Sequence, residues 1–378
     1  MRTKIGIASD HGGFEIKQKL EMNKRTKVLK KQGISLWLDN ITRKILDDGT
    51  LEKYINELSV SGLTTNPSIF DNAITGSDDY NRSIKESDQG TDGEQLFFNL
   101  AIEDVQRAAD LFLPVYERTN RVDGFVSIEV SPLLAWDTES TIKAAKTLYW
   151  KVNRPNVFIK IPGTPEGLPA IESVIAEGIP VNVTLLFSAG QYEAAANAWL
   201  KGVEARAKKG LNPDVRSVAS VFVSRWDKAV SGKVPEDMLN RLGLAVSQKT
   251  YESYQRFLQS ERVQKLMNLG VSPQRLLWAS TGAKDPAVSD VLYIENLVAP
   301  FTVNTMPENT LLAYADHGTK SDILPRRCIP TDELLKRFQV EKINVKHLAA
   351  RLQKEGARSF IESWKHMINS IEKKRQLL

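Results

Sequence analysis

The chain has 378 residues, of which 42% are hydrophobic and 26% charged, proportions that exclude disordered, collagen-like and membrane-embedded proteins. Lysine and arginine number 51 against 46 acidic residues, so the net charge of +5 is mild and suits a small anionic ligand as well as a nucleic acid. The single cysteine, Cys328, cannot form an internal disulfide, and no apolar run near residue 1 is long enough for a signal peptide. We therefore expect a soluble protein of the cytoplasm, a reducing compartment.

The first 33 residues differ from the rest of the chain. KIGIAS is typical of a strand and SDHGG of a turn, and 14–33 predicts a basic helix that ends at Gly33 as its carboxyl cap. One β-α unit has no sheet in which to bury its apolar face. The lysine-rich run KRTKVLKK has no interleaved aromatic residues, so it predicts a solvated helix face.

After residue 33, short apolar runs alternate with longer segments of helical period, such as 93–112 and 188–209. This is the pattern of β/α units around a parallel sheet. Eight strand units favour a closed (β/α)8 barrel of the TIM type, fold class α/β, over an open sheet. The predicted strands are 34–39, 62–66, 125–130, 157–162, 180–187, 217–225, 276–281 and 301–306.

Two helical segments, 332–343 and 346–374, follow the last predicted strand. No linker rich in proline, glycine or serine precedes them, so we expect them to pack across the barrel. The predicted organisation is a short β-α extension at 1–22 and one barrel domain at 23–378.

Lys160 is the central candidate for chemistry. In a β/α barrel the reactive side chains lie at the carboxyl ends of the strands, because the βα loops share one mouth. Lys160 lies in the strand VFIKIP among apolar neighbours. It is either a structural lysine held by one carboxylate or an amine that forms a Schiff base with a carbonyl substrate, a reaction that burial favours.

Two carboxylates, Asp39 and Glu129, are predicted at the ends of other strands. Schiff-base chemistry needs proton carriers for the loss of water from the carbinolamine and for the opening or closing of a carbon–carbon bond. Taken singly, each acid could be a salt-bridge partner, and Asp39 could cap the helix that follows it. Their combination with Lys160 in one mouth favours the catalytic interpretation.

An anion site is expected after the late strands. Arg225 follows the sixth predicted strand, and Ser280 and Lys284 lie in ASTGAKDP around the end of the seventh. Barrels commonly bind phosphate at this position, although two exposed loop cations without a ligand are the alternative. The segment GTPEG at 163–167 lacks the Gly-Lys-Ser/Thr ending of a P-loop, so it predicts only a turn.

Four motifs, GLTTNPSIF, VFIKIPGTPEG, VNVTLLFS and SVASVFVSRWD, closely resemble the transaldolase family in their order and spacing. The resemblance extends from about Gly33 to the carboxyl terminus and is strongest to the longer bacterial branch. There ASTGAKDPAVSDVLYIENLVAP has its counterpart, and a lysine, here Lys284, replaces an arginine of shorter members.

The resemblance implies transfer of a dihydroxyacetone unit from a ketose phosphate, fructose 6-phosphate or sedoheptulose 7-phosphate, to an aldose phosphate, erythrose 4-phosphate or glyceraldehyde 3-phosphate. This reaction belongs to the non-oxidative pentose phosphate pathway, and the family uses no metal or organic cofactor.

The resemblance also implies a role for each matching residue. Lys160 would form the Schiff base, and Asp39 would take and return the proton of the substrate hydroxyl. Glu129 would act in the carbinolamine steps through a water that Thr184 helps to hold. The residues implied to shape the dihydroxyacetone pocket are Asn66, Ser127, Asn182, Thr184, Ser220 and Phe222, and those implied to hold the phosphate are Arg225, Ser280 and Lys284.

The opening segment MRTKIGIASDHGGFEIKQKL resembles a different family, the B-type ribose-5-phosphate isomerases, in their first strand and helix. The remainder of that domain, including its catalytic cysteine region, is missing from the sequence. We therefore expect residues 1–22 to be vestigial and without isomerase activity.

Two alternatives stay open. A fructose 6-phosphate aldolase of the same fold would cleave its substrate without an acceptor, but that branch lacks the counterpart of Glu129. A catalytically silent sugar-phosphate-binding barrel would be free to lose Lys160, Glu129 and Asp39. We expect phosphorylated sugars as partners, no nucleic acid or membrane, and a monomer or homodimer.

Overall fold

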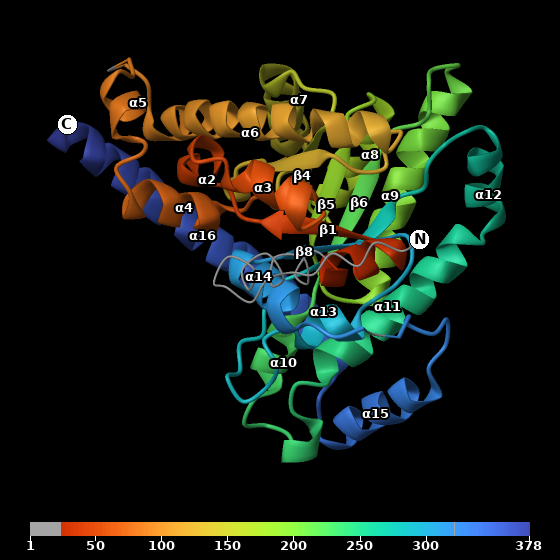
Figure 1. The fold of residues 1–378 in the computed structure, drawn as a ribbon. Coiled ribbons are helices and arrows are strands. Elements are labelled where there is room, and N and C mark those ends of the chain that lie inside the picture. The colour runs from red at the N-terminus through yellow and green to blue at the C-terminus, as the bar shows by residue number, and fades with distance from the viewer. Residues whose placement is uncertain (1–23, 89, 321) are drawn as a thin grey trace, which may run out of the picture.

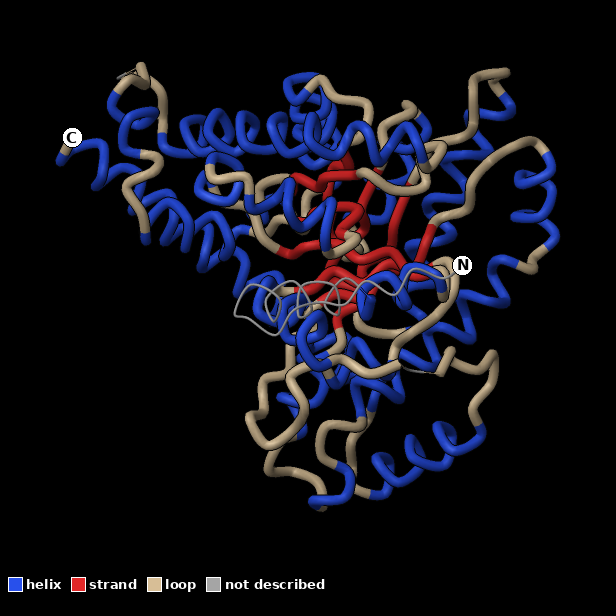
Figure 2. The backbone as a smooth tube through the Cα atoms, in the orientation of Figure 1, coloured by secondary structure: helices blue, strands red, loops and turns tan. Residues whose placement is uncertain are grey.

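The computed structural model describes residues 24–88, 90–320 and 322–378, and an eight-stranded barrel forms its centre. The strands follow chain order around the barrel, all neighbours are parallel, and β8 closes on β1. Figure 2 shows these strands surrounded by helices. The expected closed (β/α)8 fold is confirmed. The strands are β1 (Ile34–Asp39), β2 (Val60–Thr64), β3 (Phe125–Glu129), β4 (Val157–Pro162), β5 (Val181–Leu186), β6 (Ser217–Phe222), β7 (Arg275–Ala279) and β8 (Thr302–Met306).

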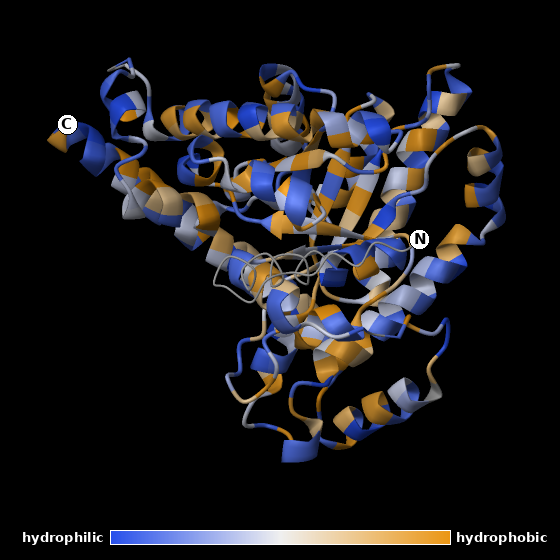
Figure 3. Ribbon diagram, in the orientation of Figure 1, coloured by the Kyte–Doolittle hydropathy of each residue, from blue (hydrophilic) through white to orange (hydrophobic). Residues whose placement is uncertain are grey.

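Helices connect the strands and cover the outside of the barrel (Figure 1). Figure 3 shows that these helices carry both hydrophobic and hydrophilic residues, as expected where one face of a helix packs on the barrel. The helices are α2 (Arg43–Asp47), α3 (Thr50–Glu57), α4 (Pro67–Gly76), α5 (Asn81–Lys85), α6 (Gly93–Arg118), α7 (Thr138–Val152), α8 (Gly167–Ala176), α9 (Ala189–Lys208), α10 (Ser224–Val230), α11 (Leu242–Leu258), α12 (Glu261–Asn268), α13 (Leu292–Asn296), α14 (Glu308–His317), α15 (Ile329–Val340) and α16 (Val345–Leu377), with 3-10 turns at Pro132–Leu134 and Glu236–Met238.

The eight predicted strands are all present, with shifts at their ends. β2 begins at Val60, before the predicted start at 62, and β6 ends at Phe222, before the predicted end at 225. The run SVASVFVSR is apolar on both sides of the turn, so its composition does not mark where α10 begins.

The helix before β1 is described over 24–31, and its lysines are exposed as expected. Gly33 follows it with a φ of +87°, the left-handed conformation of a carboxyl cap. The predicted strand and SDHGG turn at 1–22, and the proposed isomerase-like segment, lie outside the described residues.

An apolar layer fills the middle of the barrel. Side chains two apart on a strand share a face, so Trp37 and Phe158 point inward with Asp39 and Lys160. Phe158 stacks on Phe125 with ring centroids 4.1 Å apart, and Trp37 lies 6.1 Å from Phe158. Other members of the same buried cluster are Val218, Leu277 and Val303. This layer separates the two ends of the barrel interior.

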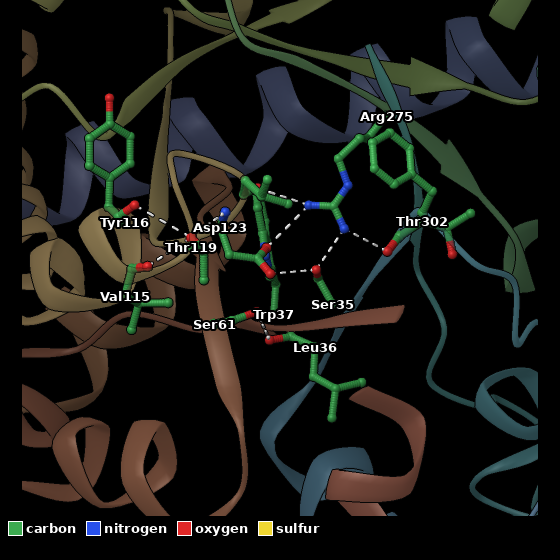
Figure 4. Close-up of polar contacts among 12 residues, drawn as sticks. Ser35, Leu36, Trp37, Ser61, Val115, Tyr116, Thr119, Asp123, Arg275 and Thr302 are labelled. Carbon is green, nitrogen blue, oxygen red and sulfur yellow. Dashed lines mark hydrogen bonds and ion pairs between the residues drawn. The ribbon is translucent and has the colours of Figure 1, made fainter. Parts of the chain in front are cut away.

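A buried polar network closes the amino-terminal end of the barrel (Figure 4). Arg275 forms an ion pair with Asp123 at 3.2 Å and donates hydrogen bonds to Ser35 Oγ (2.6 Å) and Thr302 O (2.9 Å). Asp123 also accepts hydrogen bonds from Ser35 Oγ and Trp37 Nε1. At this end of a TIM barrel, such a network serves stability rather than catalysis.

The two carboxyl-terminal helices occupy different places, in contrast to the prediction that both cross the barrel. α15 packs beside α11, whereas α16 contacts α4, α6 and β5. Figure 1 shows α15 apart from the strands and α16 running past them. Within the described residues, no helix combines the length and apolar character needed to cross a membrane.

Candidate active site

Lys160 lies at the carboxyl end of the barrel with its side chain 6% exposed. Its Nζ is 3.2 Å from Glu129 Oε2 and donates a hydrogen bond of 2.9 Å to Thr65 O. The pair follows from strand register, because Glu129 of β3 is directly opposite Lys160 of β4. A structural lysine would form the same ion pair, so the surroundings of the pair decide its role.

Asp39 supplies a second carboxylate near the same amine. Asp39 is partly exposed as a whole residue, but its carboxyl is buried, and this burial raises the pKa of Asp39. The charges of Lys160 and Lys284 oppose that rise. Thr64 Oγ1 donates a hydrogen bond of 2.7 Å to Asp39. The alternative that Asp39 caps the helix after it is wrong, because the side chain of Thr42 caps that helix, α2.

Glu129 and Thr184 carry buried oxygens that are available to a further partner. Burial raises the pKa of Glu129, Lys160 opposes that rise, and the charge of Asp39 adds to it. Apart from the ion pair, neither carboxylate oxygen of Glu129 has a hydrogen-bond partner among the described residues, and the same holds for Thr184 Oγ1. Buried polar atoms are normally hydrogen-bonded, so these oxygens suit a water or a substrate group.

Hydrogen bonds link the small polar residues predicted beside Lys160. Asn182 donates to Ser127 Oγ at 3.0 Å and accepts from Ser220 Oγ at 2.7 Å, so three strands present one connected polar surface. Asn66 is the N-cap residue of α4, and its Oδ1 accepts a hydrogen bond from the backbone N–H of Ile69 in the first turn. Its amide nitrogen is not used in that cap.

The three predicted phosphate residues follow β6 and β7. The guanidinium of Arg225 lies 5.2 Å from the Phe222 ring centroid, and burial lowers the pKa of Arg225. No carboxylate pairs with it in the described parts of the chain. Ser280 Oγ is 2.9 Å from Ser224 Oγ at the start of α10, and Lys284 is exposed.

α16 supplies site residues that the motifs did not predict. The ring of Phe360 contacts two of the predicted site cations, with its centroid 5.8 Å from Lys160 Nζ and 5.7 Å from Arg225 Cζ. One turn earlier, a Cβ on Gly356 would lie 3.0 Å from both Arg225 Nη1 and Leu185 Cδ2, so glycine permits the close approach of these two side chains. Gln353, on the same face, donates to carbonyl oxygens at the ends of β4 and β5.

A cavity of about 650 Å³ lies elsewhere, between α6, α7 and the end of α16. Its lining includes Glu94 and Lys143, but it lacks an amine flanked by two buried carboxylates. The barrel mouth is therefore the better candidate for covalent chemistry.

The fold and mouth define a (β/α)8-barrel protein with a lysine-centred site. The chain belongs to the family described as Transaldolase/Fructose-6-phosphate aldolase, whose model matches residues 36–371. It is 44% identical over 361 residues to a transaldolase of Arthrobacter sp. (strain FB24), covering 93% of this chain and 97% of the relative. It is 40% identical to a transaldolase of Trichodesmium erythraeum (90% and 95% covered) and 39% identical to "Transaldolase 2" of Nostoc punctiforme (93% and 97%).

Proposed function

We propose that this chain is a transaldolase that moves a dihydroxyacetone unit from a ketose phosphate to an aldose phosphate through a Schiff base on Lys160. The observation that carries the proposal is a buried amine 3.2 Å from Glu129 and within the electrostatic influence of Asp39. Membership of the transaldolase family supports the same reaction.

Lys160 and Glu129 carry out the first half of the covalent step. The amine attacks the C2 carbonyl of the ketose phosphate and forms a carbinolamine, which loses water to give the Schiff base. A carboxyl whose pKa is raised by burial can hold the proton that these steps transfer. Glu129 does so through a water that also contacts the Thr184 hydroxyl.

Asp39 acts on the carbon–carbon bond. Its carboxylate takes the proton of the C4 hydroxyl as the C3–C4 bond breaks, and the electron pair of that bond moves toward the nitrogen of the Schiff base. The aldose phosphate leaves and the three-carbon enamine stays on Lys160. The enamine then bonds to the carbonyl carbon of an acceptor aldehyde, whose oxygen takes the proton from Asp39. Hydrolysis of the resulting Schiff base releases the product ketose phosphate and frees the amine of Lys160. The pocket around Asn182, Ser127 and Ser220 holds the hydroxyls of the three-carbon unit.

The far end of the substrate is held by the cations after β6 and β7. Arg225, Lys284 and the Ser280 hydroxyl bind the phosphate, which places the reacting carbons over Lys160. The unpaired charge of Arg225 fits this assignment, because a phosphate supplies the compensating charge that no described carboxylate supplies.

A coupled assay with fructose 6-phosphate tests the proposal. Continuous release of glyceraldehyde 3-phosphate should need erythrose 4-phosphate, because without an acceptor one equivalent leaves and the three-carbon unit stays on Lys160. An aldolase would release it continuously without an acceptor, and a silent barrel would release none. Glu129→Gln should slow transfer by about 10²-fold, the usual scale for a positioned acid or base. Glu204→Gln is the matched control, since Glu204 is also an ion-paired glutamate, 2.8 Å from Arg262, but lies near the carboxyl end of α9 on the outside of the barrel.

The remaining expectations belong to the same proposal. The enzyme works in the cytoplasm as a monomer or homodimer, and residues 1–22 contribute nothing to transfer. A variant without residues 1–22 should keep the wild-type rate in the coupled assay.

A further inference from the structure

Gln353 on α16 forms hydrogen bonds to the backbone at the ends of two barrel strands. Its amide nitrogen donates hydrogen bonds to Gly163 O at 2.9 Å and to Leu185 O at 3.0 Å, and the residue is only 8% exposed. A primary amide has two N–H donors, so both are used on backbone carbonyls. Gly163 follows β4, which carries Lys160, and Leu185 lies in β5.

The backbone that Gln353 holds in β5 is strained. Leu185 has a φ of +58°, in the left-handed region that disfavours a residue with a Cβ, and the β5–β6 register shifts between Val183 and Leu186. Such a conformation persists where the surrounding structure fixes it. The hydrogen bond from Gln353 fixes the carbonyl of the strained residue itself.

Thr184 stands immediately before this strained residue. Its carbonyl accepts a hydrogen bond of 2.7 Å from Gly163 N, and the carbonyl of Gly163 accepts one from Gln353, so residue Gly163 links Thr184 to Gln353. The Thr184 hydroxyl is fully buried and has no partner among the described residues. A bulge re-aims the side chains beside it, so its geometry sets the direction of this hydroxyl.

We propose that Gln353 is a positioning residue, which aims the Thr184 hydroxyl by holding the irregular end of β5 against the end of β4. This inference rests on the proposed function, in which Thr184 and Glu129 share the water used in the carbinolamine steps. Gln353 touches no reacting atom, and it acts through Thr184.

The test compares Gln353→Met, which keeps the length of the side chain but removes both donors, with Thr184→Val and the double variant. Schiff-base formation is followed by quenched-flow borohydride trapping with fructose 6-phosphate. Gln353→Met should slow trapping by about tenfold and change KM by less than about twofold, since a small misplacement of a catalytic group affects chemistry more than binding. In the Thr184→Val background, Gln353→Met should have almost no further effect.

Gln248→Met is the matched control, because Gln248 is also a buried glutamine that donates to a backbone carbonyl, Pro325 O, away from this bulge. It should leave trapping unchanged. If Gln353→Met unfolds, Gln353→Asn is used in its place. Asparagine is shorter by one methylene, so its amide is withdrawn from the two carbonyls, and trapping should again be slowed.

Equal slowing by Gln353→Met in both backgrounds would overturn the inference, as would an unchanged rate in the single variant. An unchanged rate in Thr184→Val would overturn it as well. Failure of the wild-type protein to form any adduct would instead contradict the proposed function, and this outcome is visible before any variant is made.

Discussion

Replacement of Arg225 by methionine should separate phosphate binding from folding. The Cζ atom of the guanidinium is 5.2 Å from the ring centroid of Phe222 and 5.7 Å from that of Phe360, and burial lowers the pKa of Arg225. A bidentate arginine–phosphate contact contains two charge-assisted hydrogen bonds, each worth roughly 1.5–3 kcal/mol. Loss of about 3 kcal/mol or more corresponds to a decrease in kcat/KM of at least about 10²-fold.

The same change should cost little stability. Methionine forfeits two cation–π contacts of about 0.5–1 kcal/mol each, but it also removes the desolvation cost of a charge without a carboxylate partner in the described chain. We expect the free energy of unfolding, measured in urea, to change by about 1 kcal/mol or less.

The assay compares kcat/KM for fructose 6-phosphate and for fructose in both proteins. Arg225→Met should remove most of the preference for the phosphorylated donor, whereas Arg256→Met, whose side chain is 67% exposed, should keep it. A variant that retains the full preference would refute the assignment of Arg225 to the phosphate.

Three further predictions concern other parts of the barrel. Burial raises the pKa of Asp39 in the folded protein above its ordinary value of 3.8, so ionised Asp39 destabilises the fold at neutral pH. This destabilisation is relieved as the pH falls through the raised pKa toward 3.8, because the buried carboxyl becomes protonated. Asp39→Asn should therefore abolish transfer yet raise the melting temperature at neutral pH, with a gain that shrinks on acidification; a constant gain would contradict this. Arg275→Met should lower the free energy of unfolding by about 3–5 kcal/mol in urea, because a buried carboxylate loses its cation; a loss below about 1 kcal/mol would argue against it. Gly356→Ala should raise KM for fructose 6-phosphate about tenfold, because its methyl group would press on Arg225 and equally on Leu185 at the end of β5. Gly190→Ala meets no atom within 4 Å and should match the wild type, and equal KM values for the two variants would contradict this prediction.

The order of the strands could be predicted because buried parallel strands are short apolar runs separated by helical periods. The strand ends cannot be predicted where composition is uniform, as at Val223 and Ser224, where an apolar run continues into α10. Lys160 stood out because a lysine within an apolar strand needs a partner, and the strand-end rule identified Glu129 as a candidate.

The contribution of α16 to the site could not be predicted in the same way. Gln353 is separated by 190 residues from Gly163, and no local pattern shows that a glutamine on a helix will meet two strand carbonyls. From the sequence, Phe360 is only an apolar residue and Gly356 only a small residue of an amphipathic helix. The sequence indicated that the last helices pack on the barrel, but helix docking depends on tertiary geometry that periodicity does not encode.

The network of Arg275 and Asp123 was missed for a related reason. A charged residue at the first position of a strand is ordinarily exposed to solvent. Only the closure of the barrel brings Arg275 and Asp123 together. Register across a closed sheet is set by all eight strands at once, so neither residue carries a local signal.

In the proposed reaction the amine of Lys160 bonds covalently to a ketose phosphate. Borohydride reduction in the presence of fructose 6-phosphate, followed by peptide mass spectrometry, locates this bond. We predict a single reduced three-carbon adduct on Lys160 that is lost in Lys160→Met. An adduct on another lysine, or no adduct while transfer proceeds, would show that Lys160 does not form the Schiff base.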